Sequence, residues 1–334
     1  MVRLIVHIGG AKCGSSALQR YLANNAAALR KNGVLIPGSK LDMDSEIDGH
    51  QLWFYEQMRP FGPDQHKAFF NRLGRLRVLA DKEGLNTVII SGENLINPHG
   101  FHNLFTGIEK LFEPEVILYA RRQDDYIISA WQQWYLKRGV PLATYLEQNL
   151  GKTADWSDQL LPWEEVIGQK RIRVRRYGKQ YLLKGDIVED FMTTMRVPAE
   201  GCAPLNILIN RSFSEVVGRM ASRVPDVFTN IHDNRFYGAM TYAIGEPAFK
   251  KDKGSSLFTL EERLRIFESY ANSNKMLKAK YFPGLKPDEA LFAPPDAKDV
   301  NPLTEEQKRV EEHDMLIRAV YRLAEKVKVL EQKK

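Results

Sequence analysis

The first 200 residues alternate short apolar runs with longer segments of helical periodicity. Residues 2–8 form a β-type run that stops at Gly9 and Gly10, and residues 15–32 place leucines on one helical face. Similar β-type runs follow at residues 34–36, 86–91, 116–120 and 171–176. Helices are predicted at residues 52–58, 69–85, 101–112, 125–137 and 186–195. This alternation predicts an α/β fold with a central parallel sheet flanked by helices.

The pattern changes after residue 198, where helices and loops follow one another. Helical segments are predicted at residues 213–224 and 260–280, and a last helix begins at Thr304. Because no linker or shift in composition separates these parts, we expect a single domain over residues 1–334. Its expected parts are an α/β core (1–198), a helical part (199–302) and a C-terminal helix (303–334).

The last helix carries an apolar seam of five residues spaced alternately by four and three: Leu316, Val320, Leu323, Val327 and Leu330. This is the heptad spacing of a coiled coil. The seam covers only about two heptads, which is short for a coiled coil, so packing of this helix on its own domain is the favoured interpretation. A homodimer through the helix is the alternative.

Composition excludes several classes of protein. With 43% hydrophobic residues and a net charge of +6 over 334 residues, the chain is neither disordered nor fibrous. The two cysteines, Cys13 and Cys202, supply neither a disulfide framework nor a cysteine-based zinc site. The sequence shows no signal peptide and no apolar run long enough for a membrane span, so we expect a cytoplasmic protein. The mild basic charge contains no Lys/Arg block, which favours small anionic ligands over nucleic acid.

A glycine-rich loop joins the first predicted strand to the first predicted helix. Gly9, Gly10 and Gly14 lie at the point where backbone N–H groups and the helix dipole together form an anion site. Lys12 precedes Gly14, whereas in a Walker A loop the lysine follows the last glycine. The pattern therefore predicts a phosphate-binding loop of a different type.

The run Lys12-Cys13-Gly14-Ser15-Ser16 resembles the signature loop of the sulfotransferases that use 3′-phosphoadenosine 5′-phosphosulfate (PAPS), in the bacterial, carbohydrate-type branch. The resemblance implies a P-loop-type domain in which Lys12 contacts the oxygen between phosphate and sulfate. It also implies that the 5′-phosphate is held by Gly10, Cys13, Gly14, Ser15 and Ser16. A fixed ammonium beside a departing phosphate oxygen stabilises the transition state, and no metal is expected.

A second motif follows the predicted strand at residues 116–120, where Arg121 is followed eight residues later by Ser129. The same family binds the 3′-phosphate with an arginine and a serine at this separation, and a guanidinium suits a phosphate. By the same resemblance, Tyr177 contacts the adenine, and the basic loop at residues 250–254 closes over the 3′-phosphate. Ala17 stands where cytosolic members carry an adenine-stacking tryptophan, so the adenine must pack differently.

Transfer to a hydroxyl needs a general base, for which the sequence offers Glu93 and His50. Glu93 follows the predicted strand at residues 86–91, at the edge of the sheet where sites of α/β proteins gather, and is narrowly favoured. His50 lies in a loop that supplies the base in several glycan-modifying members. The segment that follows Leu150 contains an acidic residue and two tryptophans that either line an acceptor cleft or pack in the interior: Asp155, Trp156 and Trp163.

These features predict an enzyme that moves a sulfuryl group from PAPS to a hydroxyl, with a carbohydrate as the expected acceptor and PAP (adenosine 3′,5′-bisphosphate) as product. One alternative is an ATP-dependent P-loop kinase, which would share a phosphate cradle. The other is a catalytically inactive, sulfotransferase-like module that binds glycans.

Overall fold

The computed structural model describes residues 1–204, 213–245, 248 and 254–332. The chain divides into two compact units, of which the first contains a β-sheet and the second is mostly helical. The first unit consists of Met1–Arg122, Ala154–Asn210 and Asn272–Phe292. The second unit consists of Gln123–Thr153, Arg211–Ala271 and Ala293–Lys334. The expectation of a single domain stays a prediction.

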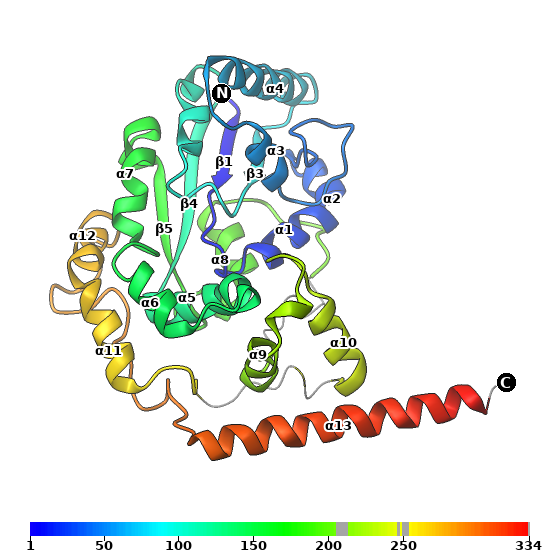
Figure 1. Cartoon of the computed structure of the whole chain (residues 1–334). Coiled ribbons are helices and arrows are strands. Elements are labelled where there is room, and N and C mark those ends of the chain that lie inside the picture. The colour runs from blue at the N-terminus through cyan, green and yellow to red at the C-terminus, as the bar shows by residue number, and fades with distance from the viewer. Residues whose placement is uncertain (205–212, 246–247, 249–253, 333–334) are drawn as a thin grey trace. The chain divides into compact units, whose positions relative to one another are not determined.

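Five parallel strands form the sheet, in the spatial order β2-β3-β1-β4-β5 (Figure 1). They are β1 (Arg3–His7), β2 (Val34–Leu35), β3 (Thr87–Ser91), β4 (Glu113–Arg121) and β5 (Ile172–Tyr177). β1 lies in the centre, with Val6 opposite Ile90 of β3 and Val116 of β4. Every residue of β3 is buried, as expected for a parallel strand that is covered on both faces. The predicted α/β fold with a parallel sheet is confirmed.

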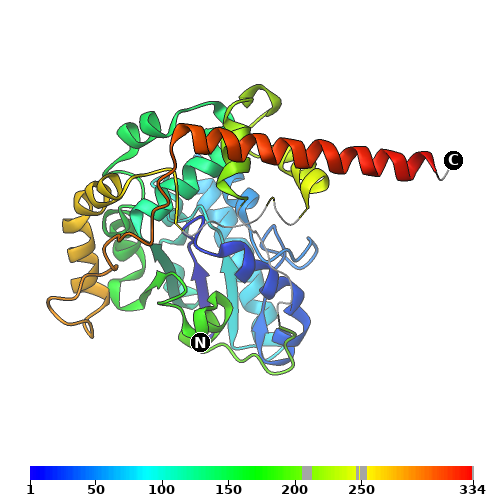
Figure 2. The ribbon, with the colours of Figure 1, turned by 90° about the horizontal axis from the view of Figure 1, so that it is seen from below.

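Helices cover the sheet of the first unit, and Figures 1 and 2 show α7 and α1 on opposite sides of the strands. The helices of this unit are α1 (Ser15–Asn24), α2 (Ala26–Lys31), α3 (Leu52–Gln57), α4 (Pro63–Lys82), α7 (Trp156–Ile167), α8 (Ile187–Thr194) and α12 (Ala271–Tyr281). Short 3-10 helices are η1 (Phe101–Phe105), η2 (Ile108–Lys110), η5 (Gln169–Arg171) and η6 (Leu183–Gly185). α1 packs on α8, while α4 and α7 both pack on η1.

The helix predicted over residues 15–32 is divided into α1 and α2 at Asn25. The Asn25 side chain donates to the Tyr21 carbonyl (3.0 Å) and exchanges hydrogen bonds with the backbone of Ala203 (3.1 and 2.8 Å). An asparagine side chain that bonds to backbone groups in this way competes with the helical hydrogen bonds. The division therefore comes from a partner far along the chain.

Two other segments of the first unit differ from their predictions. Residues 101–112 form η1 and η2 and not one α-helix, because Gly107 between them adopts a left-handed conformation (φ 82°). No helix was predicted between residue 137 and the strand at 171, but this stretch contains α7, whose first turn is capped by Asp155 through the Asp158 N–H (3.1 Å). α7 contains Pro162, and because proline usually ends a helix, the local pattern did not predict one here.

The second unit is built from α5 (Gln123–Ala130), α6 (Leu142–Asn149), α9 (Glu215–Ser222), α10 (Arg235–Ile244), α11 (Leu260–Ser269) and α13 (Glu305–Glu331). Short helical turns are η3 (Trp131–Tyr135), which is π-helical, η4 (Leu136–Arg138) and η7 (Pro225–Val227). The helix predicted over residues 125–137 is thus α5 followed by these irregular turns. The helix predicted over residues 260–280 is divided at Tyr270, whose hydroxyl donates to the Thr153 carbonyl (2.6 Å) and accepts from the Gly151 N–H (3.0 Å).

A buried ion pair joins α5 and α11 in the second unit. The Arg263 guanidinium lies 2.5 Å from a carboxylate oxygen of Asp124, and both side chains are almost fully buried. Asp125, which is partly exposed, lies 3.0 Å from the same guanidinium. Across the residues that the structure describes, no helix is both long and apolar enough to cross a membrane.

Candidate functional site

The residues predicted to bind PAPS follow the carboxyl ends of parallel strands, which meet at one edge of the sheet. The glycine loop (residues 8–14) follows β1, Glu93 follows β3, Arg121 ends β4 and Tyr177 ends β5. The strand order places β3 and β4 on either side of β1. Such an edge is where α/β proteins bind their ligands.

The glycine loop makes its turn through three residues with positive φ: Gly9 (101°), Lys12 (63°) and Gly14 (82°). A Cβ atom at Gly9 would lie 2.3 Å from the Glu93 carbonyl oxygen, so only glycine fits there. The Cys13 N–H donates to the Gly10 carbonyl (3.2 Å) and closes the turn. Gly14 is the N-cap residue of α1, whose first turn contains no acidic residue. The loop therefore delivers the positive end of the α1 dipole to this edge of the sheet.

Arg121 joins the second predicted motif to the first. Its Nη1 atom donates to the Lys12 carbonyl (2.9 Å), and its guanidinium lies 5.8 Å from the centre of the Tyr177 ring. The Arg121 carbonyl in turn accepts from the Trp156 indole N–H (2.8 Å). Two cationic residues that are 109 positions apart in sequence thus lie together at the start of α1.

Glu93 also lies at the start of α1. The Ser15 hydroxyl donates to the Glu93 carboxylate (2.7 Å), so this candidate base contacts a residue of the predicted phosphate cradle. Ser15 is buried, whereas Glu93 and Ser16, the next residue of α1, are half-buried. Among the described residues, no group of three or more His, Cys, Asp or Glu side chains is placed to hold a metal ion.

His50, the second candidate base, is held near the end of β3. Its neighbour Gln51 donates from its backbone N–H to the Ser91 carbonyl (3.0 Å) and accepts from the Ser91 N–H through its side chain (3.0 Å). The His50 imidazole Nε2 atom lies 3.5 Å from a carboxylate oxygen of Asp48. Both candidate bases therefore lie near the end of β3, and the choice between them stays open.

The other predicted cofactor residues of the first unit pack under the loop. Tyr177 lies against Gly14, where a Cβ atom would come within 3.0 Å of its ring, and burial raises the pKa of the Tyr177 phenol. Cys13 is fully buried, and burial raises the pKa of its thiol to about 12. Cys13 therefore remains a neutral thiol, and only its backbone could face a ligand.

Trp156 and Trp163 do not line an acceptor cleft, since each side chain is only 1% exposed. Trp156 covers Gly10, where a Cβ atom would lie 3.0 Å from the indole, and Trp163 donates to the Leu95 carbonyl (3.3 Å). The role of Trp156 in holding Arg121 was missed by the reading of the sequence, because the contact depends on how α7 packs beside β4.

A buried polar cluster behind the loop also escaped prediction. The His7 Nδ1 atom is hydrogen-bonded to the Ser91 hydroxyl (2.8 Å), and the Gln19 side chain donates to the same hydroxyl (3.0 Å). Burial lowers the pKa of His7 to about 4. This cluster ties the ends of β1 and β3 to α1 and thereby supports the loop from below.

The remaining predicted residues belong to the second unit or lie outside the described residues. Ser129 is on α5 in the second unit, where it is 8% exposed. Lys250 to Lys253 lie outside the residues that the structure describes, so the predicted closing loop is represented only by Gly254. The proposed roles of Ser129 and of this loop stay predictions.

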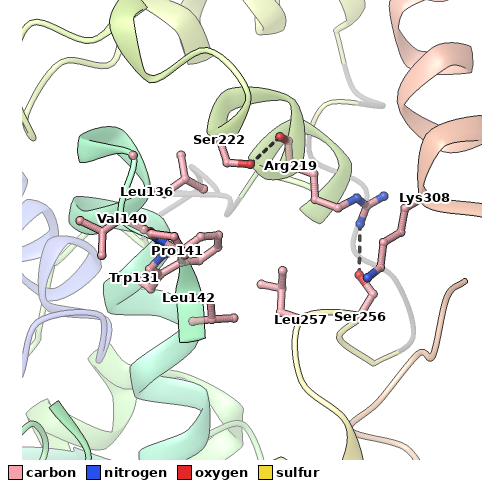
Figure 3. Close-up of a pocket in the computed structure, with 11 residues that line it drawn as sticks. Trp131, Leu136, Val140, Pro141, Leu142, Arg219, Ser222, Ser256, Leu257 and Lys308 are labelled. Atoms are coloured by element: carbon pink, nitrogen blue, oxygen red, sulfur yellow. Dashed lines mark hydrogen bonds between the residues drawn. The ribbon is translucent and has the colours of Figure 1, made fainter. Parts of the chain in front are cut away.

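A separate cavity of about 380 Å³ lies within the second unit (Figure 3). Apolar side chains and four polar ones line it: Trp131, Leu136, Val140, Pro141, Leu142 and Leu257, with Arg219, Ser222, Ser256 and Lys308. Arg219 donates to the Ser256 hydroxyl (3.1 Å) and forms ion pairs with Glu311 and Glu312. These carboxylates neutralise the arginine, so the cavity does not present an uncompensated guanidinium to an anion.

Comparison with known proteins does not assign a function to this chain. No model of a known protein family matches the sequence, and no solved structure matches it. The chain is similar to an uncharacterized protein of Archaeoglobus fulgidus, with 25% identity over 171 residues, which make up 50% of this chain and 46% of the relative. The chain thus matches about half the length of this curated relative, and the similarity indicates neither a family nor an activity.

Proposed function

We propose that this chain is a PAPS-dependent sulfotransferase that transfers a sulfuryl group to a hydroxyl, with a carbohydrate as the acceptor class. The observation that carries the proposal is the hydrogen bond from Arg121 of the second motif to the carbonyl of Lys12 in the first (2.9 Å), at the start of α1. The sheet order β2-β3-β1-β4-β5, with the loop after the central strand, supports a P-loop-type arrangement.

The residues present fit an anionic nucleotide. Lys12 and Arg121 supply two positive charges, and the N-terminus of α1 adds the end of a helix dipole. Backbone N–H groups from Gly14 to Ser16 would hold the 5′-phosphate, and Arg121 would hold the 3′-phosphate. PAPS supplies an activated sulfuryl group, and Lys12 would stabilise the negative charge that develops on the departing phosphate oxygen.

The hydrogen bond from Ser15 to Glu93 supports Glu93 as the base, because it holds a carboxylate beside the proposed phosphate cradle. A carboxylate at this position can accept the proton of an acceptor hydroxyl, which suits the role of general base. His50 is held beside the same strand end and remains the alternative base. Replacement of the true base is expected to lower kcat by about 10²- to 10⁴-fold, so Glu93→Gln and His50→Gln should differ strongly in turnover.

One observation favours an ATP-dependent kinase as a second candidate. The Ser15 hydroxyl and the Glu93 carboxylate, 2.7 Å apart at the start of α1, form the kind of pair that binds Mg²⁺ beside nucleotide phosphates. The position of Lys12 before Gly14 does not follow the kinase-type Walker A order. We therefore rank this candidate below the sulfotransferase.

A thermal-shift titration separates the two candidates. PAP in a chelator is expected to raise the melting temperature, because a ligand at a hundred times its Kd stabilises the folded state by about 2.7 kcal/mol. ATP with magnesium should produce no comparable rise. A larger response to ATP with magnesium than to PAP would overturn the sulfotransferase and support the kinase. A PAP response without sulfuryl transfer to any of a panel of sugars would point to the inactive glycan-binding module.

Two variants with a matched control test the roles of the cationic residues. Arg121→Met should lose the response to PAP but keep the response to AMP, which has no 3′-phosphate. Lys12→Met should lower the rate of sulfuryl transfer by about 10²- to 10³-fold, the usual effect of removing one transition-state contact. Lys82→Met, at an exposed lysine in the last turn of α4, should leave both properties unchanged. Equal losses of AMP and PAP binding in Arg121→Met would indicate a collapsed loop.

A further inference from the structure

α13 packs on α9 and α10 within the second unit. Arg219 of α9 pairs with Glu312 (3.2 Å), and Arg322 donates to the Ile244 carbonyl at the end of α10 (2.5 Å). Ala319, between these contacts, is the buried residue of this face. The helix thus packs on α9 and α10 of its own unit, and the polar contacts there are made by Arg219, Glu312 and Arg322.

The apolar seam of α13 (Leu316, Val320, Leu323, Val327 and Leu330) stays largely exposed beside this packing, although Leu316 and Leu323 lie one turn before and after the buried Ala319. Its five side chains are between 41% and 59% exposed. Figures 1 and 2 both show the C-terminal end of the helix running past α10. Packing within the chain therefore does not explain why apolar residues repeat here at heptad spacing. An exposed apolar stripe of this kind indicates a surface that binds a partner.

The residues at each heptad position indicate which partner fits. The spacing assigns Leu316, Leu323 and Leu330 to the d positions and Val320 and Val327 to the a positions. A β-branched residue at a with leucine at d favours two parallel strands. The sequence departs from this pattern upstream, where His313 would be the preceding a residue.

We propose that α13 pairs with α13 of a second copy of this chain as a short parallel coiled coil through the seam. A helix can pack against neighbours on two adjacent faces, as in a four-helix bundle, so the contact with α9 and α10 leaves room for a second helix. Ile317 and Ala324, at the e positions, widen the apolar surface, and Ile317 is 54% exposed.

The seam is short, but α13 is already folded before it pairs, which lowers the cost of pairing. Isolated helices are marginal because their residues must be ordered before they can pair. α13 is already helical over Glu305–Glu331, begins with a capping box between Thr304 and Gln307, and is held by α9 and α10. Dimerisation therefore orders few additional residues, and two heptads suffice.

The mass of the full chain in solution tests the proposal. Sedimentation velocity over a range of concentrations is expected to show a species of twice the 38.3 kDa chain mass. Leu323→Glu should yield monomers, since it places like charges face to face in the central d layer. Val329→Glu is the matched control, because Val329 is 49% exposed on the same helix but outside the seam, and this variant should remain dimeric. Circular dichroism should show equal helix content in all three proteins, since both side chains are exposed.

A cross-link tests the orientation of the two helices. In a parallel pair the two copies of residue 330 face each other, whereas in an antiparallel pair centred on Leu323 they lie at opposite ends. Leu330→Cys in a Cys202→Ser background should therefore form a disulfide dimer on mild oxidation, with the fully buried Cys13 left in place. A monomeric wild type, or a dimer that survives Leu323→Glu, would overturn the pairing. A dimer that does not cross-link would overturn its parallel orientation.

Discussion

Protonation of His7 is expected to destabilise the folded protein as the pH falls below neutrality. His7 ends β1, is fully buried, and its ring lies edge-on to Tyr119 (6.2 Å) and Phe191 (6.3 Å). Burial lowers its pKa from 6.5 to about 4. A positive charge at this place would be far from water, so the folded chain keeps His7 neutral where the unfolded chain binds a proton.

The two pKa values determine the size and the pH range of the effect. Between pH 6.5 and pH 4 the unfolded state binds more protons than the folded state, so stability decreases as the pH falls. The stability that the neutral His7 contributes is fully present above pH 6.5 and is lost by about pH 4. A pKa difference of this size corresponds to about 3 kcal/mol in total, of which about 2 kcal/mol is lost between pH 7 and pH 5.

Urea unfolding at a series of pH values measures this loss. His7→Asn keeps an amide group near the Ser91 hydroxyl but cannot titrate, so its stability should depend less on pH than that of the wild type. The difference between the two proteins should change by about 2 kcal/mol from pH 7 to pH 5. The control His99→Asn, at an exposed histidine, should follow the wild type. Parallel pH curves for the wild type and His7→Asn would refute the reasoning.

Three further substitutions test the packing of the two units. Gly14→Ala should destabilise the fold by about 1 to 3 kcal/mol, because Gly14 has φ 82° and a Cβ atom would lie 2.8 Å from Ile187. Gly74→Ala, in an open helical position, should instead stabilise it by about 0.5 to 1 kcal/mol, and equal melting temperatures for the two variants would contradict this account. Arg263→Met should cost about 3 kcal/mol or more in urea unfolding, because it takes the guanidinium away from the buried Asp124. An unchanged unfolding midpoint would show that the ion pair contributes nothing.

The local sequence was sufficient to predict the strands and the position of the loop. β1 and β3 are short runs of β-formers that are buried over most or all of their length, and such parallel strands need no other signal. β5 is instead recognised by its β-formers, which alternate with arginines. The glycines of the loop were recognisable for the same reason, since Gly9 and Gly14 adopt backbone conformations that other residues rarely adopt. The heptad spacing of α13 was also visible, because it depends only on residues within one helix.

Only the tertiary structure decided which residues meet. Arg121 bonds to the Lys12 carbonyl across 109 positions, and Ser15 bonds to Glu93 across 78. Asn25 divides a predicted helix by bonding to Ala203 across 178 positions. Such contacts follow from the order of the strands in the sheet and from the packing of helices on it, and neither leaves a trace in a local pattern. For the same reason, the sequence showed the seam of α13, but only the fold showed that the helix packs on α9 and α10 while the seam residues stay exposed.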